Sequence, residues 1–118
     1  MKAIRGAVNF LKDEPQEVYK KTEELIVELI KRNGLSEADI VCVVFSTTKD
    51  IKCMYPAKVF REKFYSTVPL FSTTEPDIDG GMPLTLRILA LADVKSPVPV
   101  YLYETKKLRS DLFNEYCD

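Results

Sequence analysis

The fold is decided by residues 13–34, which read DEPQEVYKKTEELIVELIKRNG. Asp13 can cap a helix at its start, a proline stands in the first turn, and Gln16 lies three residues after the cap. Gly34 suits the left-handed residue that ends a helix. Inner-face residues recur between these ends at helical spacing, at positions 18, 22, 25, 26, 29 and 30. The stretch therefore predicts one long helix over residues 14–33, with a charged face in solvent and an apolar face on a sheet.

Apolar runs on both sides of this helix predict the strands of that sheet. Residues 2–9 alternate and predict an opening strand, in which Gly6 marks a bulge or a close backbone approach. Residues 40–46 (IVCVVFS) are almost continuously apolar and predict a strand buried on both faces. Residues 67–71 predict another strand, in which Pro69 leaves the N–H side unpaired, and residues 100–103 predict the last strand.

Residues 84–92, which read LTLRILALA, allow two interpretations. Leu84, Leu86 and Ile88 alternate as in a strand, which would place Arg87 on the opposite face. A proline followed by leucine and alanine would equally start a helix. We favour the strand.

The remaining elements complete a mixed α/β arrangement. Ser36–Asp39 predicts a short capped turn, and Pro56 predicts the start of a short helix with Val59 and Phe60 towards the core. The order β-α-β-(short α)-β-β-β predicts an α/β, or α+β-like, domain with a mixed five-stranded sheet covered by one long and one short helix. One long helix covers only one face of such a sheet. The other apolar face therefore predicts a homo-oligomer.

Length and composition restrict the class of protein. The chain has 118 residues, 46% hydrophobic and 30% charged, which predicts a single ordered domain over 1–118. A net charge of -1 gives no general attraction for nucleic acid or an acidic membrane. Three cysteines without CxxC spacing suggest neither a disulfide framework nor a zinc site, and no apolar run approaches the ~20 residues that span a bilayer. We expect a cytoplasmic protein.

The chain contains no histidine. Histidine is the commonest general base and the commonest metal ligand, so its absence excludes Ser-His and Cys-His nucleophile pairs. An enzyme with this sequence would depend on positioning and electrostatics more than on proton transfer.

The candidate site lies in residues 70–87, which read LFSTTEPDIDGGMPLTLR. Arg87 interrupts an apolar run, and Arg5 is a second arginine among apolar neighbours. One interpretation is an edge-strand arginine that extends to water. The other is an arginine at the floor of an anion pocket, walled by the hydroxyl residues and Glu75. Glu75 could instead structure the bend at Gly80–Gly81.

Several short motifs together resemble the monofunctional, trimeric α/β class of chorismate mutase. They are Ile4-Arg5-Gly6-Ala7, Tyr55-Pro56-Ala57-Lys58 with Arg61, Val68-Pro69 leading to Glu75, Asp77 with Gly80-Gly81 and Arg87, and Val100-Tyr101-Leu102 with Leu108-Arg109 and Asp111-Leu112. The resemblance runs from about residue 3 to residue 112. It implies a homotrimeric pseudo-barrel with a flexible tail from about residue 105.

The resemblance implies conversion of chorismate to prephenate, a [3,3] rearrangement within one molecule on the route to phenylalanine and tyrosine. No cofactor, metal or covalent intermediate is implied. Such a catalyst holds a reactive conformer and stabilises the charge that develops as a C–O bond breaks.

The resemblance also implies roles for individual residues. Arg87 would donate to the ether oxygen, Arg5 would bind a carboxylate, and Glu75 would accept a hydrogen bond from the ring hydroxyl. Tyr101 would offer its phenol to a carboxylate. The remaining pocket walls would come from Phe71, Ser72, Thr73 and Thr74.

In the family the pocket lies between subunits, so further residues would come from the neighbour. Those lining the pocket would be Tyr55, Ala57, Lys58 and Arg61. Leu108 and Arg109 would close over it. For Lys58, Arg61 and Arg109, a position on the solvated surface is an equally good interpretation. For Tyr101, the simpler interpretation is a tyrosine at a subunit interface.

The sequence departs from the family at a few positions. Ser72 stands where cysteine is common, Pro76 fixes the backbone after Glu75, Val8 replaces a threonine and Tyr55 a phenylalanine. None of these changes removes a charge. The alternative function is a non-catalytic trimeric module that binds a small carboxylate or has a regulatory role, since fold alone does not fix function.

Overall fold

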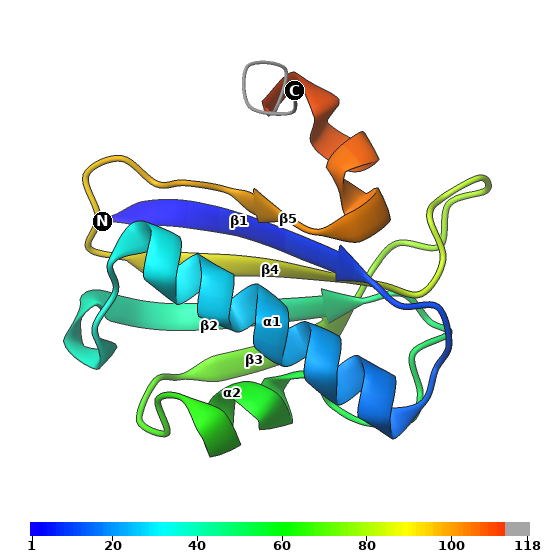
Figure 1. Cartoon of the computed structure of the whole chain (residues 1–118), viewed down its shortest axis with the longest axis horizontal. Helices are drawn as coiled ribbons and strands as arrows, with labels where there is room; N and C mark the ends of the chain where they lie inside the picture. The colour runs from blue at the N-terminus through cyan, green and yellow to red at the C-terminus, as the bar shows by residue number, and fades with distance from the viewer. Residues whose placement is uncertain (113–118) are drawn as a thin grey trace.

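The computed structural model describes residues 1–112 and the side chains of residues 1–109. Its five strands form one mixed sheet in the order β3-β2-β4-β1-β5 (Figure 1). They are β1 (Lys2–Asn9), β2 (Ile40–Thr47), β3 (Leu70–Thr74), β4 (Thr85–Ala92) and β5 (Val100–Tyr101). β4 runs antiparallel to both of its neighbours, whereas β3 is parallel to β2 and β5 is parallel to β1. The mixed five-stranded sheet is confirmed, and residues 84–92 are confirmed as a strand.

Helix α1 (Pro15–Asn33) crosses one face of this sheet, and α2 (Ala57–Lys63) lies beside it (Figure 1). Gly34 ends α1 in the left-handed conformation, with φ of 59°. The inner face of α1 buries Val18, Leu25 and Leu29 among other residues. The predicted long helix, its end and its covering role are confirmed. None of the described helices is long and apolar enough to cross a membrane.

At Gly6, leucine side chains of α1 pack directly against the backbone of the sheet. A Cβ atom at this position would lie 2.8 Å from Cδ1 of Leu29 and 3.4 Å from Cδ1 of Leu25. Both leucines are buried, so a side chain here would displace the helix or its core contacts. The glycine therefore marks a close approach, one of the two predicted reasons for its presence.

The predicted cap at the start of α1 is wrong. Glu14 occupies the cap position and makes no side-chain cap hydrogen bond. The carboxylate of Asp13 instead accepts hydrogen bonds from the backbone N–H of Lys52 at 2.9 Å and of Cys53 at 3.2 Å. Asp13 is thus used to hold a distant loop against the start of the helix. A hydrogen bond from the Cys53 thiol lowers the pKa of Asp13, while burial raises the pKa of Cys53 to about 11.

β2 is buried on one face only, which corrects the prediction of two buried faces. Val43 and Phe45 lie in the core beneath the helices, whereas Val41 is 49% exposed. The sequence of β2 is almost continuously apolar because its side chains are apolar on both faces of the strand. The helices of one chain cover only one of these faces.

Two strand boundaries also differ from the sequence prediction. β3 begins at Leu70 instead of residue 67, because the backbone N–H and hydroxyl of Thr67 both donate to the Glu37 carboxylate and hold that segment as a loop. β5 ends at Tyr101 instead of residue 103. Tyr103 adopts a φ of 57° and begins η2 (Tyr103–Leu112).

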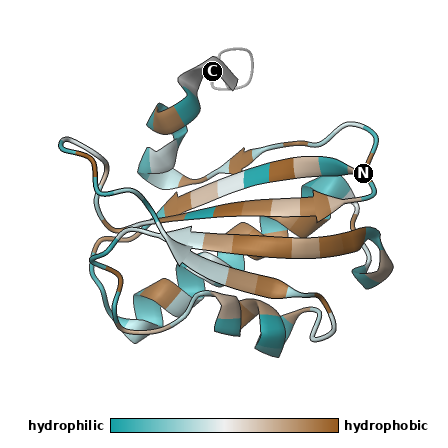
Figure 2. Cartoon of the chain, turned by 180° about the vertical axis from the view of Figure 1, so that it is seen from behind, coloured by the Kyte–Doolittle hydropathy of each residue, from teal (hydrophilic) through white to brown (hydrophobic). Residues whose placement is uncertain are grey.

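Figure 2 views the sheet from the side away from α1 and α2, and we call this side of the sheet the open face. It carries Phe71, which is 65% exposed, and Leu89, which is 41% exposed. η2 covers this face only beside β1, where the Thr105 hydroxyl donates to the Ala7 carbonyl at 3.1 Å. A second hydrogen bond joins the backbone N–H of Glu104 to the Asn9 side chain at 2.9 Å.

Candidate active site

The open face carries one row of side chains that crosses all five strands. The pairing registers join Thr73 to Ser46, Ser46 to Arg87, Arg87 to Ala7, and Ala7 to Tyr101. Directly paired residues of neighbouring strands present their side chains on the same face. Arg87 therefore lies at the centre of the row, on the central strand β4.

Arg87 has a carboxylate beside it. Its Nε atom lies 3.9 Å from Oε1 of Glu75, and the two side chains are 49% and 18% exposed. The backbone N–H of Glu75 donates to the Thr47 carbonyl at 2.8 Å, which fixes the chain just beyond the end of β3. Arg87 makes no hydrogen bond to any residue within the described part of the chain, so its N–H donors remain available for a ligand.

Arg5 brings a second positive charge to the same face. It pairs with Leu89, two residues along β4 from Arg87, and is therefore a diagonal neighbour of Arg87. Arg5 is exposed and forms no ion pair within residues 1–112. Two arginines without hydrogen-bonded acceptors on one face suit a ligand with more than one carboxylate.

Tyr101 ends the row beside η2. It is 8% exposed and packs with Ala7, while Leu108 is half-buried against this pair. Arg109 stands at the kink that divides η2, with φ of -137° and ψ of 59°. Tyr101, Leu108 and Arg109 are thus gathered at one end of the row. Asp111 and Leu112 belong to η2. Residues 113–118, which include Cys117, lie outside the described part of the chain.

The hydroxyl residues of β3 divide between two faces. Thr73 pairs with Ser46 on the open face, and Phe71 lies two residues before it on the same side. Ser72 pairs with Phe45, a core residue, and therefore faces the helices. Within one chain, the side chains from Phe71 to Thr74 therefore lie alternately on the open face and on the side of the helices.

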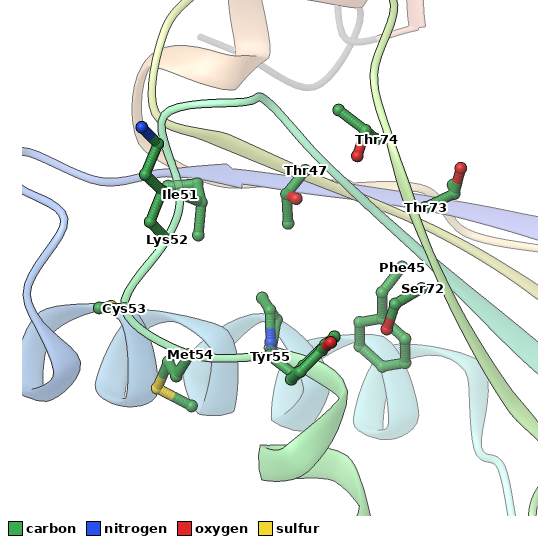
Figure 3. A pocket seen from close by; sticks show the side chains of 11 residues that line it. Phe45, Thr47, Ile51, Lys52, Cys53, Met54, Tyr55, Ser72, Thr73 and Thr74 are labelled. Atoms are coloured by element: carbon green, nitrogen blue, oxygen red, sulfur yellow. The ribbon is translucent and has the colours of Figure 1, made fainter.

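Ser72 and Thr74 line a cavity of about 560 Å³ on the side of the helices, and Thr73 contributes to its rim from the edge strand (Figure 3). Thr47, Lys52 and Tyr55 line other parts of it. The cavity is bounded by edge strand β3 on one side and by the loop before α2 on the other (Figure 3). Its lining includes the core residue Phe45, so most of the cavity lies on the face of the sheet opposite to Arg87.

The candidates around α2 lie near this cavity. Tyr55 is 73% exposed, and Lys58 and Arg61 are exposed on α2. Neither cation forms an ion pair with a residue that the structure describes. Ala57 is buried in the hydrophobic core, so its methyl group does not line a surface of the chain. One chain therefore does not bring Tyr55, Lys58 or Arg61 next to Arg87.

The structure adds residues that the sequence did not single out. The turn Thr47–Asp50 bonds both to Glu75 and to the residues at the start of β4. The sequence indicated a turn here only through its composition, because Thr and Asp side chains often form hydrogen bonds to nearby backbone groups in turns. Within residues 1–112, no group of three or more His, Cys, Asp or Glu side chains could hold a metal ion.

The fold is that of an α+β protein, and its open sheet face carries Arg87 beside Glu75, with Arg5 as a diagonal neighbour. The family model described as chorismate mutase type I matches residues 1–112. The chain belongs to this family, and the resemblance found in its motifs is confirmed. Its activity is that of a chorismate mutase, an isomerase.

Individual relatives agree with this assignment over almost the whole chain. Chorismate mutase AroH of Thermus thermophilus is 33% identical over 117 residues, covering 95% of this chain and 96% of the relative. Chorismate mutase AroH of Bacillus subtilis is 31% identical over 117 residues, covering 95% of this chain and 92% of the relative. A solved chorismate mutase from Clostridium thermocellum superposes with a TM-score of 0.86 at 28% identity, covering 91% of this chain and 99% of that one.

Proposed function

We propose that this chain rearranges chorismate to prephenate in active sites that form between the subunits of a homotrimer. The observation that carries the proposal is the position of Arg87 beside Glu75 on the open face. The substrate is a dicarboxylate with a ring hydroxyl and an enolpyruvyl ether. Its rearrangement needs a held conformer and charge stabilisation, which suits a chain without histidine.

Arg87 is the residue that stabilises the transition state. Negative charge develops on the ether oxygen as the C–O bond breaks, and a guanidinium stays charged and presents a rigid fork of donors. The strand β4 holds the backbone of Arg87 between two neighbouring strands, so the donor is positioned before the reaction begins. A preorganised donor of this kind acts mainly on the rate of the chemical step.

Arg5 and Glu75 complement the two ends of the substrate. Arg5, on the same face, binds a carboxylate through a paired hydrogen bond. Glu75 accepts the hydrogen bond of the ring hydroxyl and offsets the positive side of the transition state. Tyr101, at the end of the row, orients a carboxylate together with the chain around Leu108 and Arg109.

The neighbouring subunit supplies the opposite wall. The open face is partly apolar, and covering it requires a second copy of the chain. Tyr55, Lys58 and Arg61 lie on the other side of the sheet in one chain, so they can reach Arg87 only from a neighbour. A trimer closes such contacts into a ring and gives three equivalent sites.

We infer that residues 1–118 act as one domain, in which the segment around Leu108 and Arg109 closes over the site beside Tyr101. We also infer a cytoplasmic location, because Cys42 and Cys53 are both free and half-buried in the described part of the chain.

The proposal is tested by following chorismate absorbance after addition of the purified protein and of its Arg87→Ala variant. We expect rapid loss of chorismate with the parent protein, formation of a product that acid converts to phenylpyruvate, and near-complete loss of turnover in the variant. A folded parent protein that binds dicarboxylates without turning over chorismate would instead identify a carboxylate-binding module.

A further inference from the structure

The turn Thr47–Asp50 joins the backbone segments that carry Glu75 and Arg87. On one side, the Thr47 carbonyl accepts the backbone N–H of Glu75 at 2.8 Å. On the other, the backbone N–H of Thr48 donates to the Thr85 carbonyl at 3.0 Å, and the Thr48 hydroxyl accepts the backbone N–H of Thr85 at 3.0 Å. Only Leu86 separates Thr85 from Arg87, so the same turn sets the distance between Glu75 and Arg87.

Asp50 holds this turn to the start of β4. Its carboxylate accepts the backbone N–H of Leu84 with Oδ1 at 3.2 Å and Oδ2 at 3.0 Å. It also accepts the hydroxyl of Thr48 at 2.5 Å, which directs that hydroxyl's lone pairs towards Thr85. One carboxylate therefore orders both the turn and the first residues of the strand.

The segment that Asp50 holds is conformationally strained. Leu84 has a φ of 48°, a left-handed conformation that a leucine adopts only when surrounding bonds enforce it. Its carbonyl accepts the backbone N–H of Phe10 at 2.8 Å, and its N–H is the group bound by Asp50. Without the carboxylate, Leu84, three residues before Arg87, can relax and displace the start of β4.

We propose that Asp50 is a positioning residue that sets Arg87 at its working distance from Glu75. This inference rests on the proposed function of Arg87. Asp50 acts on Arg87 through the backbone N–H of Leu84, and it is assigned no contact with the substrate. Because Arg87 acts mainly in the transition state, a small displacement of its strand should lower kcat and leave KM almost unchanged.

The test compares kcat and KM for chorismate among variants of the turn. Asp50→Ala removes the acceptor of Leu84, and Thr48→Val removes the hydroxyl with little change of shape. Thr48→Ser restores that hydroxyl. Asp79→Asn is the matched control, because Asp79 is an exposed aspartate of the following bend with no bond to a described residue.

We expect Asp50→Ala and Thr48→Val to lower kcat by about 10–100-fold with KM within about 3-fold of the parent value. Thr48→Ser and Asp79→Asn should behave like the parent. Variants of the turn that melt at a lower temperature but retain the parent kcat would reduce Asp50 to a stabilising role and overturn the proposal. If Asp50→Ala does not fold, the Thr48→Val and Thr48→Ser pair gives the same decision.

A double-mutant cycle with Arg87→Lys separates positioning from general damage. If Asp50 acts through Arg87, adding Asp50→Ala to Arg87→Lys should cost less than about 3-fold in kcat. A full additive loss would mean that Asp50 acts independently of Arg87 and would overturn the inference. A parent protein without turnover would contradict the proposed function, which is a different result from any of these.

Discussion

The guanidinium Nε of Arg87 lies 3.9 Å from Oε1 of Glu75 on the open face of the sheet. This separation is too long for a hydrogen bond but short enough for the charges to stabilise one another. A pair with this much exposure contributes only about 0–1 kcal/mol to folding. Both side chains therefore keep hydrogen-bonding capacity for a third molecule, and their contribution should appear in catalysis more than in stability.

Replacing Arg87 tests the first half of this relationship. Arg87→Ala should lower kcat by at least about 10²–10³-fold, because a preorganised donor to the developing negative charge is lost. The melting temperature should stay close to that of the parent, since the side chain is half exposed. Steady-state kinetics and thermal unfolding of the same preparation check both values. Equal turnover by the two proteins would remove Arg87 from the active site.

Replacing Glu75 tests the second half. Glu75→Gln keeps the size of the side chain and removes its charge, so kcat should fall by about 10–100-fold. The matched control is Glu28→Gln, which removes a carboxylate that pairs with Arg32 at 2.8 Å on α1. The control should retain the parent rate. Similar small losses in both variants would show that the charge of Glu75 has no special role.

The bonds of Asp13 predict a pH dependence of stability. The hydrogen bond from the Cys53 thiol lowers the pKa of Asp13 in the folded protein. Its stabilising contribution is therefore fully present above the ordinary carboxyl pKa of about 3.9 and is lost as the pH falls through the lowered folded value. Asp13→Asn should cost about 1 kcal/mol in free energy of unfolding at pH 7 and progressively less as the pH falls below 4.

Urea unfolding of both proteins at several pH values between 2 and 7 measures this difference. Glu14→Gln serves as the control, because Glu14 is exposed and makes no side-chain cap bond. A difference between the parent and Asp13→Asn that stays constant over this pH range would contradict the role assigned to the Asp13 carboxylate.

The open face predicts the effect of a charge on assembly. Leu89→Asp should shift the mass in solution from trimer towards monomer, because the new carboxylate would be buried without a partner in the subunit contact. Val27→Asp is the control, since Val27 is 42% exposed on α1 and Leu89 is 41% exposed on the sheet. Light scattering at several protein concentrations gives both masses. A Leu89→Asp trimer as stable as the parent would place the contact elsewhere.

Local sequence patterns predicted most of the fold. The helix over residues 14–33 follows from its apolar spacing and from Gly34, and the alternation around Arg87 places that residue on the face away from the helices. The errors arose where side chains bond to distant backbone. Asp13 resembles a cap, yet its carboxylate holds Lys52 and Cys53, and Thr67 is held by Glu37.

The candidate site was predictable as a set of residue types but not as an arrangement. Arg87 and Glu75 are twelve residues apart in sequence, and their proximity depends on the order of β3, β2 and β4 in the sheet. Ser72 and Thr73 read as one polar run, although the alternation of a strand places them on opposite faces. For Asp50 the sequence indicated only a turn residue, because its hydrogen-bond partner Leu84 lies 34 residues away in the chain.

Mixing two defective variants tests most directly whether the active site is shared between subunits. Arg87→Ala and Arg61→Ala are each expected to be nearly inactive, and hybrid trimers can be formed by unfolding and refolding them together. If Arg87 of one subunit works with Arg61 of its neighbour, an equal mixture should recover about a quarter of the parent activity, because about one site in four then combines two intact walls. Mass spectrometry confirms the hybrids. Hybrid trimers as inactive as either variant alone, or an Arg61→Ala protein with full activity, would contradict an active site shared between these two arginines.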